Sequence, residues 1–255
     1  MIDTHTHILA ALDDGPQTWN QAIEMCYMAY EDGIRTIVAT PHILPGIFVY
    51  PPQVILEKLA YLQTLLQEER LDITLLPGAE LHADPDLLTK IQKQQVLSLN
   101  HTSYILLEFS FSRFPPRVEE YVGTFIHQGI TPIIAHAERI KEVQAHPQKL
   151  SPLVRRGALV QVTSMSLTGG FGPAAQRCAA LLLQHNLCHI IASDAHSLQR
   201  RPPLLTPGVD VAAQLIGETR ARAMVTTIPQ AVVRGERVKN LLPLPSILRQ
   251  ISSER

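Results

Sequence analysis

The sequence predicts an α/β fold, a distorted (β/α)7 TIM-like barrel, and three observations lead to this prediction. About seven short, apolar and β-branched segments alternate with segments of helical periodicity, which is the pattern of a parallel sheet covered by helices. The length of 255 residues suits one closed barrel. No low-complexity linker divides the chain. We therefore expect a single domain over residues 1–255, in which residues 208–255 form a helical segment that closes the barrel or contacts another subunit of a homo-oligomer.

The expected elements follow one another along the chain. Thr18 and Gln21 form a capping box that predicts the start of the first helix, and Gly33 follows its end. The residues of this helix that should face the core are Trp19, Ile23, Cys26, Tyr27 and Tyr30. The expected strands cover residues 1–7, 35–40, 73–77, 104–108, 131–136, 158–163 and 188–194. The expected later helices cover residues 51–70, 84–94, 116–128, 147–156 and 173–186.

Composition and charge exclude several classes of protein. The formal net charge is -1 and the isoelectric point is about 6.8, so the chain lacks the basic surface that holds nucleic acid or an anionic membrane. Three well-separated cysteines without Cys-x-x-Cys spacing indicate a reducing compartment. No apolar run reaches the length of a membrane span, and the first residues lack the features of a signal peptide. We expect a cytoplasmic protein with no nucleic-acid partner and no membrane insertion.

Side chains of the kind that bind metal ions stand at the ends of the expected strands. His5 and His7 lie on the same side of an extended strand, because side chains alternate between faces, so both imidazoles can reach one point. Catalytic residues converge at the carboxyl ends of barrel strands. The residues at such positions are His5, His7, His42, Glu80, Glu108, His136, Asp194 and His196. One such histidine alone would be interpreted as a core residue, but eight equivalent positions predict a metal site at this end of the barrel.

The charges of this group support the same prediction. Four carboxylates would repel one another at one barrel mouth unless cations were bound between them. They belong to Asp14, Glu80, Glu108 and Asp194. Three divalent ions would leave about two positive charges in excess, which would hold a hydroxide and attract a phosphate group. A phosphoester is therefore the expected substrate.

Short motifs follow one another between Met1 and Pro203. They are His5-Thr6-His7, Asp13-Asp14-Gly15, Thr40-Pro41-His42, Gly78-Ala79-Glu80-Leu81, Leu107-Glu108-Phe109-Ser110, Ile134-Ala135-His136-Ala137-Glu138-Arg139, Ser193-Asp194-Ala195-His196 and Arg201-Pro202-Pro203. In order and spacing they resemble the polymerase and histidinol phosphatase (PHP) superfamily. Within it, the chain most resembles the manganese-dependent protein-tyrosine phosphatases of bacterial capsular-polysaccharide synthesis.

The resemblance implies three divalent metal ions, expected to be Mn²⁺, although sites of imidazole and carboxylate ligands also accept iron, zinc or cobalt. The first implied ligand set is His5, His7, Glu80 and Asp194. Glu80 also belongs to the second set, with Glu108 and His136. The third set is Asp14, His42 and His196. Arg139 and Arg201 match the phosphate-binding arginines of the family. The general acid is left open between Asp13 and a metal-bound water.

The implied reaction is in-line attack on phosphorus by a metal-bound hydroxide. The implied substrate is a phosphotyrosine protein, such as the tail of a bacterial tyrosine kinase that regulates capsule or exopolysaccharide synthesis. Cysteine chemistry is excluded, because no cysteine is followed by arginine six residues later. Two alternatives stay open. One is a phosphatase of a small metabolite such as histidinol phosphate, which would need a closed polar pocket, and the other is a non-enzymatic metal-binding assembly module.

The apolar loop 43–50 departs from the polar or basic loop of many relatives. We hypothesise that Ile47, Phe48 and Tyr50 form a rim that packs the phosphotyrosine ring. The alternative is a loop that folds onto the barrel. Unchanged activity of Phe48→Ala on phosphotyrosine peptides would contradict the rim hypothesis.

Two other features have no assigned part in the chemistry. Thr163 stands where several relatives have asparagine. The glycine-rich segment 169–172 precedes a helix but lacks the Gly-Lys-Ser/Thr ending of a phosphate loop. We interpret that segment as a flexible connection.

Overall fold

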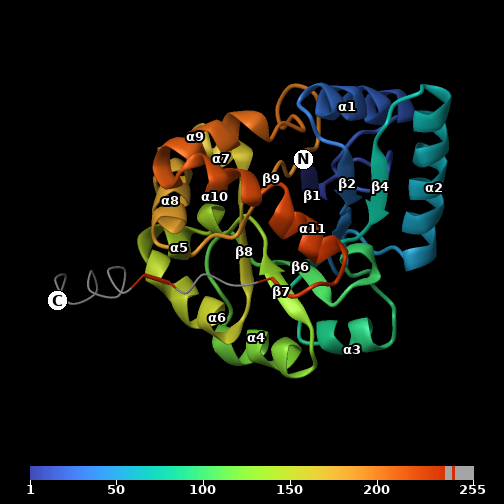
Figure 1. Cartoon of the computed structure of the whole chain (residues 1–255). Coiled ribbons are helices and arrows are strands. Elements are labelled where there is room, and N and C mark those ends of the chain that lie inside the picture. Colours follow the sequence, from blue (N-terminus) through green and yellow to red (C-terminus); the bar gives the residue numbers. More distant parts are fainter. Residues whose placement is uncertain (239–242, 245–255) are drawn as a thin grey trace.

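A computed structural model describes residues 1–238 and 243–244, and in this part of the chain seven parallel strands curl into a barrel (Figure 1). Two of the seven are broken, so that β3 continues β2 and β5 continues β4. The strands are β1 (Ile2–Thr6), β2 (Thr36–Ala39), β3 (His42–Ile43), β4 (Thr74–Pro77), β5 (Glu80–His82), β6 (Tyr104–Glu108), β7 (Thr131–Ile134), β8 (Leu159–Thr163) and β9 (Ile190–Ala192). The predicted (β/α)7 barrel is confirmed.

The strands pair in a continuous order. β1 pairs with β2 and β2 with β4, while β3, β5, β6, β7, β8 and β9 pair in that sequence. The two ends of the sheet meet because Asp194 N, just after β9, donates to His5 O in β1 at 2.9 Å. His7 N also donates to Ala195 O at 2.8 Å. The register of β1 against β2 shifts between Asp3 and Thr6, so the pairing is irregular near the carboxyl end of β1.

Helices cover the outside of the barrel (Figure 1). They are α1 (Trp19–Glu31), α2 (Pro52–Glu68), α3 (Leu87–Gln92), α4 (Val118–His127), α5 (Lys141–Ala145), α6 (Ser151–Arg156), α7 (Ser164–Leu167), α8 (Pro173–Gln184), α9 (Thr206–Ile216), α10 (Glu218–Ala223) and α11 (Thr227–Val233), with 3₁₀ turns η1 (Leu99–His101), η2 (Ala137–Arg139) and η3 (Pro147–Leu150). α3 is shorter than the expected helix 84–94, because Asp86 N donates to Asp84 Oδ1 at 2.8 Å and forms a turn first. None of the helices in the described part of the chain is long and apolar enough to cross a bilayer.

α1 begins as predicted but covers the core with a narrower face than expected. Gln21 N donates to Thr18 Oγ1 at 3.3 Å, and Thr18 N donates to Gln21 Oε1 at 3.2 Å, which completes the capping box. The prediction for Tyr27 is wrong, since this residue is 38% exposed and its hydroxyl donates to Glu69 Oε2 at 2.9 Å. Trp19, Ile23 and Tyr30 are half-buried. The buried residues of this helix are Ala22, Met25, Cys26 and Ala29.

Apolar side chains fill the interior of the barrel. Five strands contribute Val38, Leu106, Ile133, Leu159 and Ile190 to one buried cluster. Two valines of α11, residues 232 and 233, belong to this cluster, so α11 packs against the strands. α9, α10 and α11 lie between residues 206 and 233, and the assignment of 208–255 as one helical segment stays a prediction. The prediction for 239–242 and 245–255 lies outside the described residues.

We predict that Gly78→Ala lowers the free energy of unfolding by about 1–3 kcal/mol. Gly78 lies in the break between β4 and β5, where an added Cβ would come within 2.9 Å of Leu99 Cδ2 and Val38 Cγ1 inside the barrel. Gly123→Ala in α4 is the matched control. There the nearest atom to an added Cβ is Arg156 Nη1 at 3.8 Å, so alanine should raise the free energy of unfolding by about 0.4–1 kcal/mol. Urea unfolding measures both, and equal stability of the two variants would contradict the packing described.

Candidate metal centre

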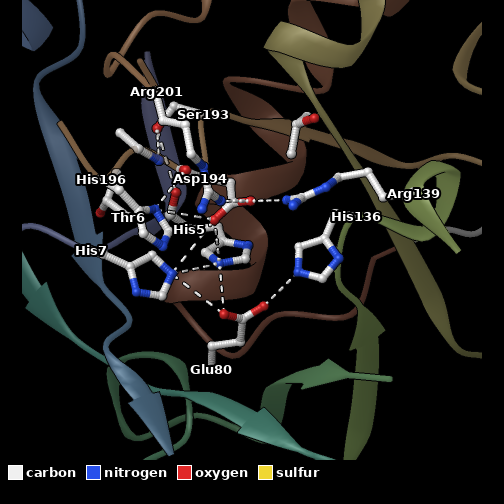
Figure 2. Close-up of polar contacts among 12 residues, drawn as sticks. His5, Thr6, His7, Glu80, His136, Arg139, Ser193, Asp194, His196 and Arg201 are labelled. Carbon is white, nitrogen blue, oxygen red and sulfur yellow. Dashed lines mark hydrogen bonds and ion pairs between the residues drawn. The ribbon is translucent and has the colours of Figure 1, made fainter. Parts of the chain in front are cut away.

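All nine residues predicted to bind metal meet at the carboxyl ends of the strands. Figure 2 shows six of them, namely His5, His7, Glu80, His136, Asp194 and His196. The candidate ligand atoms of the nine residues fall into sets within which the atoms lie no more than 4.8 Å apart. These sets are His7, Asp14, His42 and His196; His5, His7 and Glu80; His5, His136 and Asp194; and His42, Glu80 and Glu108. Because four of the nine residues belong to two sets, the donors form one continuous cluster.

The local backbone is shaped to turn ligands inward. β3 starts at His42 and β5 at Glu80, each just after a break in the strand, and these two residues are paired in register. His136 and Asp194 follow β7 and β9 with left-handed conformations, at φ of 30° and 53°. In residues other than glycine such conformations cost of the order of 1–3 kcal/mol and concentrate at functional sites.

Glu80 lies buried at the centre of the cluster. Its Oε1 accepts a hydrogen bond from His136 Nε2 at 2.8 Å. Its Oε2 lies 2.9 Å from His42 Nδ1, 3.3 Å from His5 Nε2 and 3.4 Å from His7 Nε2, yet has no hydrogen-bond partner among the described residues. Several nitrogens that surround a buried carboxylate oxygen without donating a hydrogen bond to it form the arrangement that a divalent cation completes. The donor set therefore fits a metal ion.

Asp194 joins this cluster to two arginines. Its Oδ1 is 3.2 Å from His5 Nε2 and also lacks a hydrogen-bond partner in the part of the chain described. Its Oδ2 accepts hydrogen bonds from Arg139 Nη1 at 2.8 Å and from Arg201 Nη2. Burial alone would raise the pKa of Asp194, but His5 and Arg201 hold that pKa well below its usual value. Figure 2 shows both arginines converging on this carboxylate.

Neighbouring groups determine which nitrogen of each N-terminal histidine faces the cluster. His5 Nδ1 donates to Gln161 Oε1 at 2.9 Å, and His7 Nδ1 donates to Asp13 Oδ2 at 2.6 Å. In the neutral rings the two Nε2 atoms then carry lone pairs, and they lie 3.2 Å apart. Two lone pairs at this distance repel each other unless a cation is bound between them. Hydrogen bonds behind the ring are typical of metal-binding histidines.

Asp13 and Asp14 are adjacent in the sequence but lie in different environments. Asp13 is buried, and its two oxygens also accept hydrogen bonds from Gly15 N and His42 N, both at 3.0 Å. Burial alone would raise the pKa of Asp13, but His7 and these hydrogen bonds hold that pKa well below its usual value. The Asp14 side chain is 56% exposed. Asp14 therefore lies at the open edge of the cluster, and Asp13 supports the cluster from behind.

Two buried polar residues that the sequence analysis gave no function support the cluster. Gln161 is buried in β8 and accepts the hydrogen bond from the first histidine. Glu138 is buried in η2, and its Oε1 accepts hydrogen bonds from Thr163 N at 3.0 Å, Thr163 Oγ1 at 2.8 Å and Ser166 Oγ at 2.5 Å. These bonds tie η2 to the end of β8. Gln161 could have been identified as a supporting residue from the sequence, because it is a polar residue inside an apolar strand. No periodic signal in the sequence marks Glu138.

The three residues proposed as a rim on loop 43–50 have different surroundings, and the rim hypothesis stays a prediction. Phe48 stacks on His42, with ring centres 5.8 Å apart and an angle of 11° between the planes. The Tyr50 hydroxyl donates to a backbone carbonyl, and Ile47 is 68% exposed. Of the three, Phe48 is the one that contacts a predicted ligand.

The three cysteines are buried and unreactive. Burial raises the pKa of Cys26 and Cys178 to about 12, and it raises the pKa of Cys188 as well. A thiolate nucleophile is therefore not formed near neutral pH, which agrees with the exclusion of cysteine chemistry from the sequence.

The chain is similar to known proteins in sequence. The CpsB/CapC family of capsular polysaccharide synthesis matches residues 1–234. The tyrosine-protein phosphatase YwqE of Bacillus subtilis is 40% identical over 201 residues, which are 79% of this chain and 79% of that protein. The tyrosine-protein phosphatase CpsB of Streptococcus pneumoniae is 30% identical over 238 residues, which are 91% of this chain and 98% of that protein.

Comparison of the fold with solved structures leads to the same group of proteins. The crystal structures of YwqE from Bacillus subtilis and CpsB from Streptococcus pneumoniae, metal-dependent tyrosine phosphatases, include a chain that matches with a TM-score of 0.92 and 36% identity. The match covers 96% of this chain and 99% of that chain. The resemblance seen in the motifs is confirmed, and the chain belongs to the CpsB/CapC family of capsular polysaccharide synthesis.

Proposed function

We propose that this chain is a metal-dependent tyrosine-protein phosphatase of capsular polysaccharide synthesis. Its substrate would be a phosphotyrosine protein such as the tail of a bacterial tyrosine kinase. The observation that carries the proposal is the contact of Arg139 and Arg201 with Asp194, whose other oxygen faces the histidine cluster. A site that holds cations and arginines side by side is suited to a phosphoryl group. Family membership supports tyrosine as the leaving group, because YwqE and CpsB are tyrosine-protein phosphatases.

We assign the ligands to three divalent ions, with Mn²⁺ as the expected metal. The first ion would be held by His5, His7, Glu80 and Asp194. The second would be held by Glu80, Glu108 and His136, and the third by Asp14, His42 and His196. Distances within each set support the assignment: His5 Nε2 lies 3.3 Å from Glu80 Oε2 and 3.2 Å from Asp194 Oδ1. His136 Nε2 lies 2.8 Å from Glu80 Oε1 and 3.7 Å from Glu108 Oε1. Asp14 Oδ1 lies 3.6 Å from His42 Nε2 and 3.2 Å from His196 Nε2. Bound there, divalent ions would lower the pKa of a coordinated water toward neutrality and offset the charge of the phosphoryl oxygens.

Arg139 and Arg201 would bind the phosphoryl oxygens. Each guanidinium has five N–H donors, and the contact with Asp194 uses only some of them. The remaining donors suit the fork geometry in which arginine binds phosphate. Because both side chains are already held by Asp194, they would stabilise the charge that develops on the phosphoryl oxygens in the transition state without first reorganising.

The leaving group would need little protonation. The phenol of tyrosine has a pKa of about 10, so it leaves more readily than an alkyl alcohol. We propose that Asp13 holds His7 in place rather than donating this proton, because His7 Nδ1 and two backbone N–H groups already occupy its oxygens. A water molecule at the mouth would then be the proton source for the tyrosinate.

The open mouth supports a protein substrate over a small metabolite. The Asp14 side chain is 56% exposed, and a cleft of about 410 Å³ leads from Asp14 and His196 along the start of α1. Such a cleft has room for the residues that flank a phosphotyrosine. A histidinol phosphate phosphatase would need a closed polar pocket around the whole substrate.

Phosphotyrosine peptide and histidinol phosphate should be turned over at different rates. We expect kcat/KM to be at least about tenfold higher for the peptide, because the open cleft provides contacts outside the phosphoryl group. Steady-state kinetics with Mn²⁺-loaded protein measures both. A higher value for histidinol phosphate would favour the small-metabolite phosphatase, and turnover of neither substrate would favour the non-enzymatic module.

Removal of metal should abolish phosphotyrosine turnover, and added Mn²⁺ should restore it. Glu80→Gln should lower kcat by on the order of a hundredfold or more and reduce the metal content measured by elemental analysis. Alkylation with iodoacetamide is the control, and it should leave the rate unchanged because all three cysteines are buried. Activity that survives complete metal removal would contradict the proposal.

Asp13→Asn should weaken Mn²⁺ binding by about 10- to 100-fold, because a carboxylate behind a metal-binding histidine would be lost. Calorimetric titration measures the affinity, and kcat should recover when Mn²⁺ is saturating. Asp72→Asn is the matched control, since Asp72 is exposed. If kcat of Asp13→Asn stayed low at saturating Mn²⁺ and the alkaline limb of the pH profile disappeared, Asp13 would be the general acid instead.

A further inference from the structure

We propose that Phe111 and Phe171 form the subsite that receives the phenyl ring of phosphotyrosine, and that they give the enzyme a preference for aryl over alkyl phosphates. The inference rests on the proposed function and adds to it the residues that select the leaving group. Neither phenylalanine stands out in the sequence, because each lies in an irregular segment between predicted elements.

Both rings lie against an arginine that faces the phosphoryl site. Arg139 Cζ is 4.5 Å from the centre of the Phe111 ring and 4.2 Å from the centre of the Phe171 ring. Arg201 Cζ is 5.7 Å from the centre of the Phe171 ring. These contacts are attractive because the face of an aromatic ring is electron-rich. The two phenylalanines therefore border the place where the arginines would hold the phosphoryl group.

Phe111 is exposed at the mouth although it is large and apolar. The residue is 42% exposed, and its ring centre lies 5.1 Å from that of His136. The loop that carries it is anchored, because Lys141 N donates to Phe111 O at 2.8 Å. An anchored and exposed aromatic side chain beside the cluster is suited to contact a ligand.

The glycine-rich segment before α8 is a defined turn that positions Phe171. Gly172 N donates to Gly169 O at 2.9 Å and closes the turn, and these glycines have φ of 87° and 88°. At Gly170 an added Cβ would lie 2.5 Å from Met165 Cγ, so the backbone packs closely there. The glycines thus permit the specific backbone path of this segment, which the sequence analysis interprets as a flexible connection.

The chemistry of the substrate brings its ring to these side chains. In phosphotyrosine a single bridging oxygen joins the ring to phosphorus. A phosphoryl group held by the two arginines therefore places the tyrosine ring next to both phenylalanines. Two aromatic rings in contact gain about two- to tenfold in affinity beyond the burial of their surfaces. A phosphoserine has no ring and gains nothing from this contact.

Phe48 is a competing candidate for the same contact. Its ring stacks on His42 at 5.8 Å between centres, so it borders the histidine side of the cluster. We favour Phe111 and Phe171 because they contact Arg139, which would hold the phosphoryl group.

The preference is tested with three competitive inhibitors of p-nitrophenyl phosphate hydrolysis by Mn²⁺-loaded protein: phenylphosphonate, ethylphosphonate and inorganic phosphate. Wild-type protein should bind phenylphosphonate more tightly than ethylphosphonate. Phe111→Ala and Phe171→Ala should each raise the inhibition constant of phenylphosphonate by about two- to tenfold. The inhibition constants of ethylphosphonate and inorganic phosphate should stay unchanged. Leucine at either position keeps the apolar volume without the ring, so it should also lower the aryl preference, whereas tyrosine should retain it.

Tyr61→Ala is the matched control. Tyr61 is 50% exposed on α2 and packs against Trp19, with ring centres 4.9 Å apart, so its loss should change no inhibition constant. Circular dichroism checks that each variant is folded.

If the Phe→Ala variants bound all three inhibitors more weakly by the same factor, the inference would be overturned, because the rings would then act only by supporting Arg139. Aryl preference that is unchanged in these variants, or lost only in Phe48→Ala, would also overturn it. Failure of the wild-type protein to hydrolyse a phosphotyrosine peptide would overturn the proposed function and this inference together. If the wild-type protein hydrolysed the peptide but the Phe→Ala variants kept the aryl preference, the inference alone would be overturned.

Discussion

One electrostatic constraint governs the mouth of the barrel. Glu80 and Asp194 are buried carboxylates, and each presents an oxygen that no hydrogen bond satisfies among the described residues. A buried carboxylate oxygen without a partner is strongly unfavourable. The nitrogens of His5, His7 and His42 surround these oxygens and leave the charge unbalanced when the rings are neutral. Cations between the donors would satisfy both carboxylates, and the free energy of metal binding would offset the strain of the left-handed residues that build the mouth.

The strand that carries no predicted ligand supports the strands that do. β8 contains Gln161, which accepts a hydrogen bond from His5, and Thr163, which donates twice to Glu138. Glu138 precedes Arg139 in the same 3₁₀ turn. One strand therefore orients a histidine of the cluster and also anchors the turn that carries Arg139. Under the proposed function, metal binding and phosphate binding would both depend on the position of β8.

The barrel and the cluster could be predicted because both leave local signals in the sequence. Apolar, β-branched runs mark the strands, and a histidine or carboxylate directly after such a run marks a carboxyl end. Supporting contacts leave no such signal, since His5 and Gln161 are 156 residues apart. Asp13 and Asp14 look alike in the sequence, yet one is buried behind a histidine and the other is largely exposed. Tyr27 shows the same limit, because helical periodicity marks an apolar stripe but not the edge at which the core ends.

The residue at position 163 shows why the side chain there can change without disturbing the site. The backbone N–H of Thr163 donates to Glu138 Oε1 at 3.0 Å, and this bond does not depend on the identity of the side chain. Thr163 Oγ1 adds a second donor at 2.8 Å, and Ser166 Oγ adds a third at 2.5 Å. An asparagine amide would likewise offer an N–H donor. The requirement at this position is a hydrogen-bond donor to a buried carboxylate, so threonine can replace asparagine while the turn that carries Arg139 stays in place.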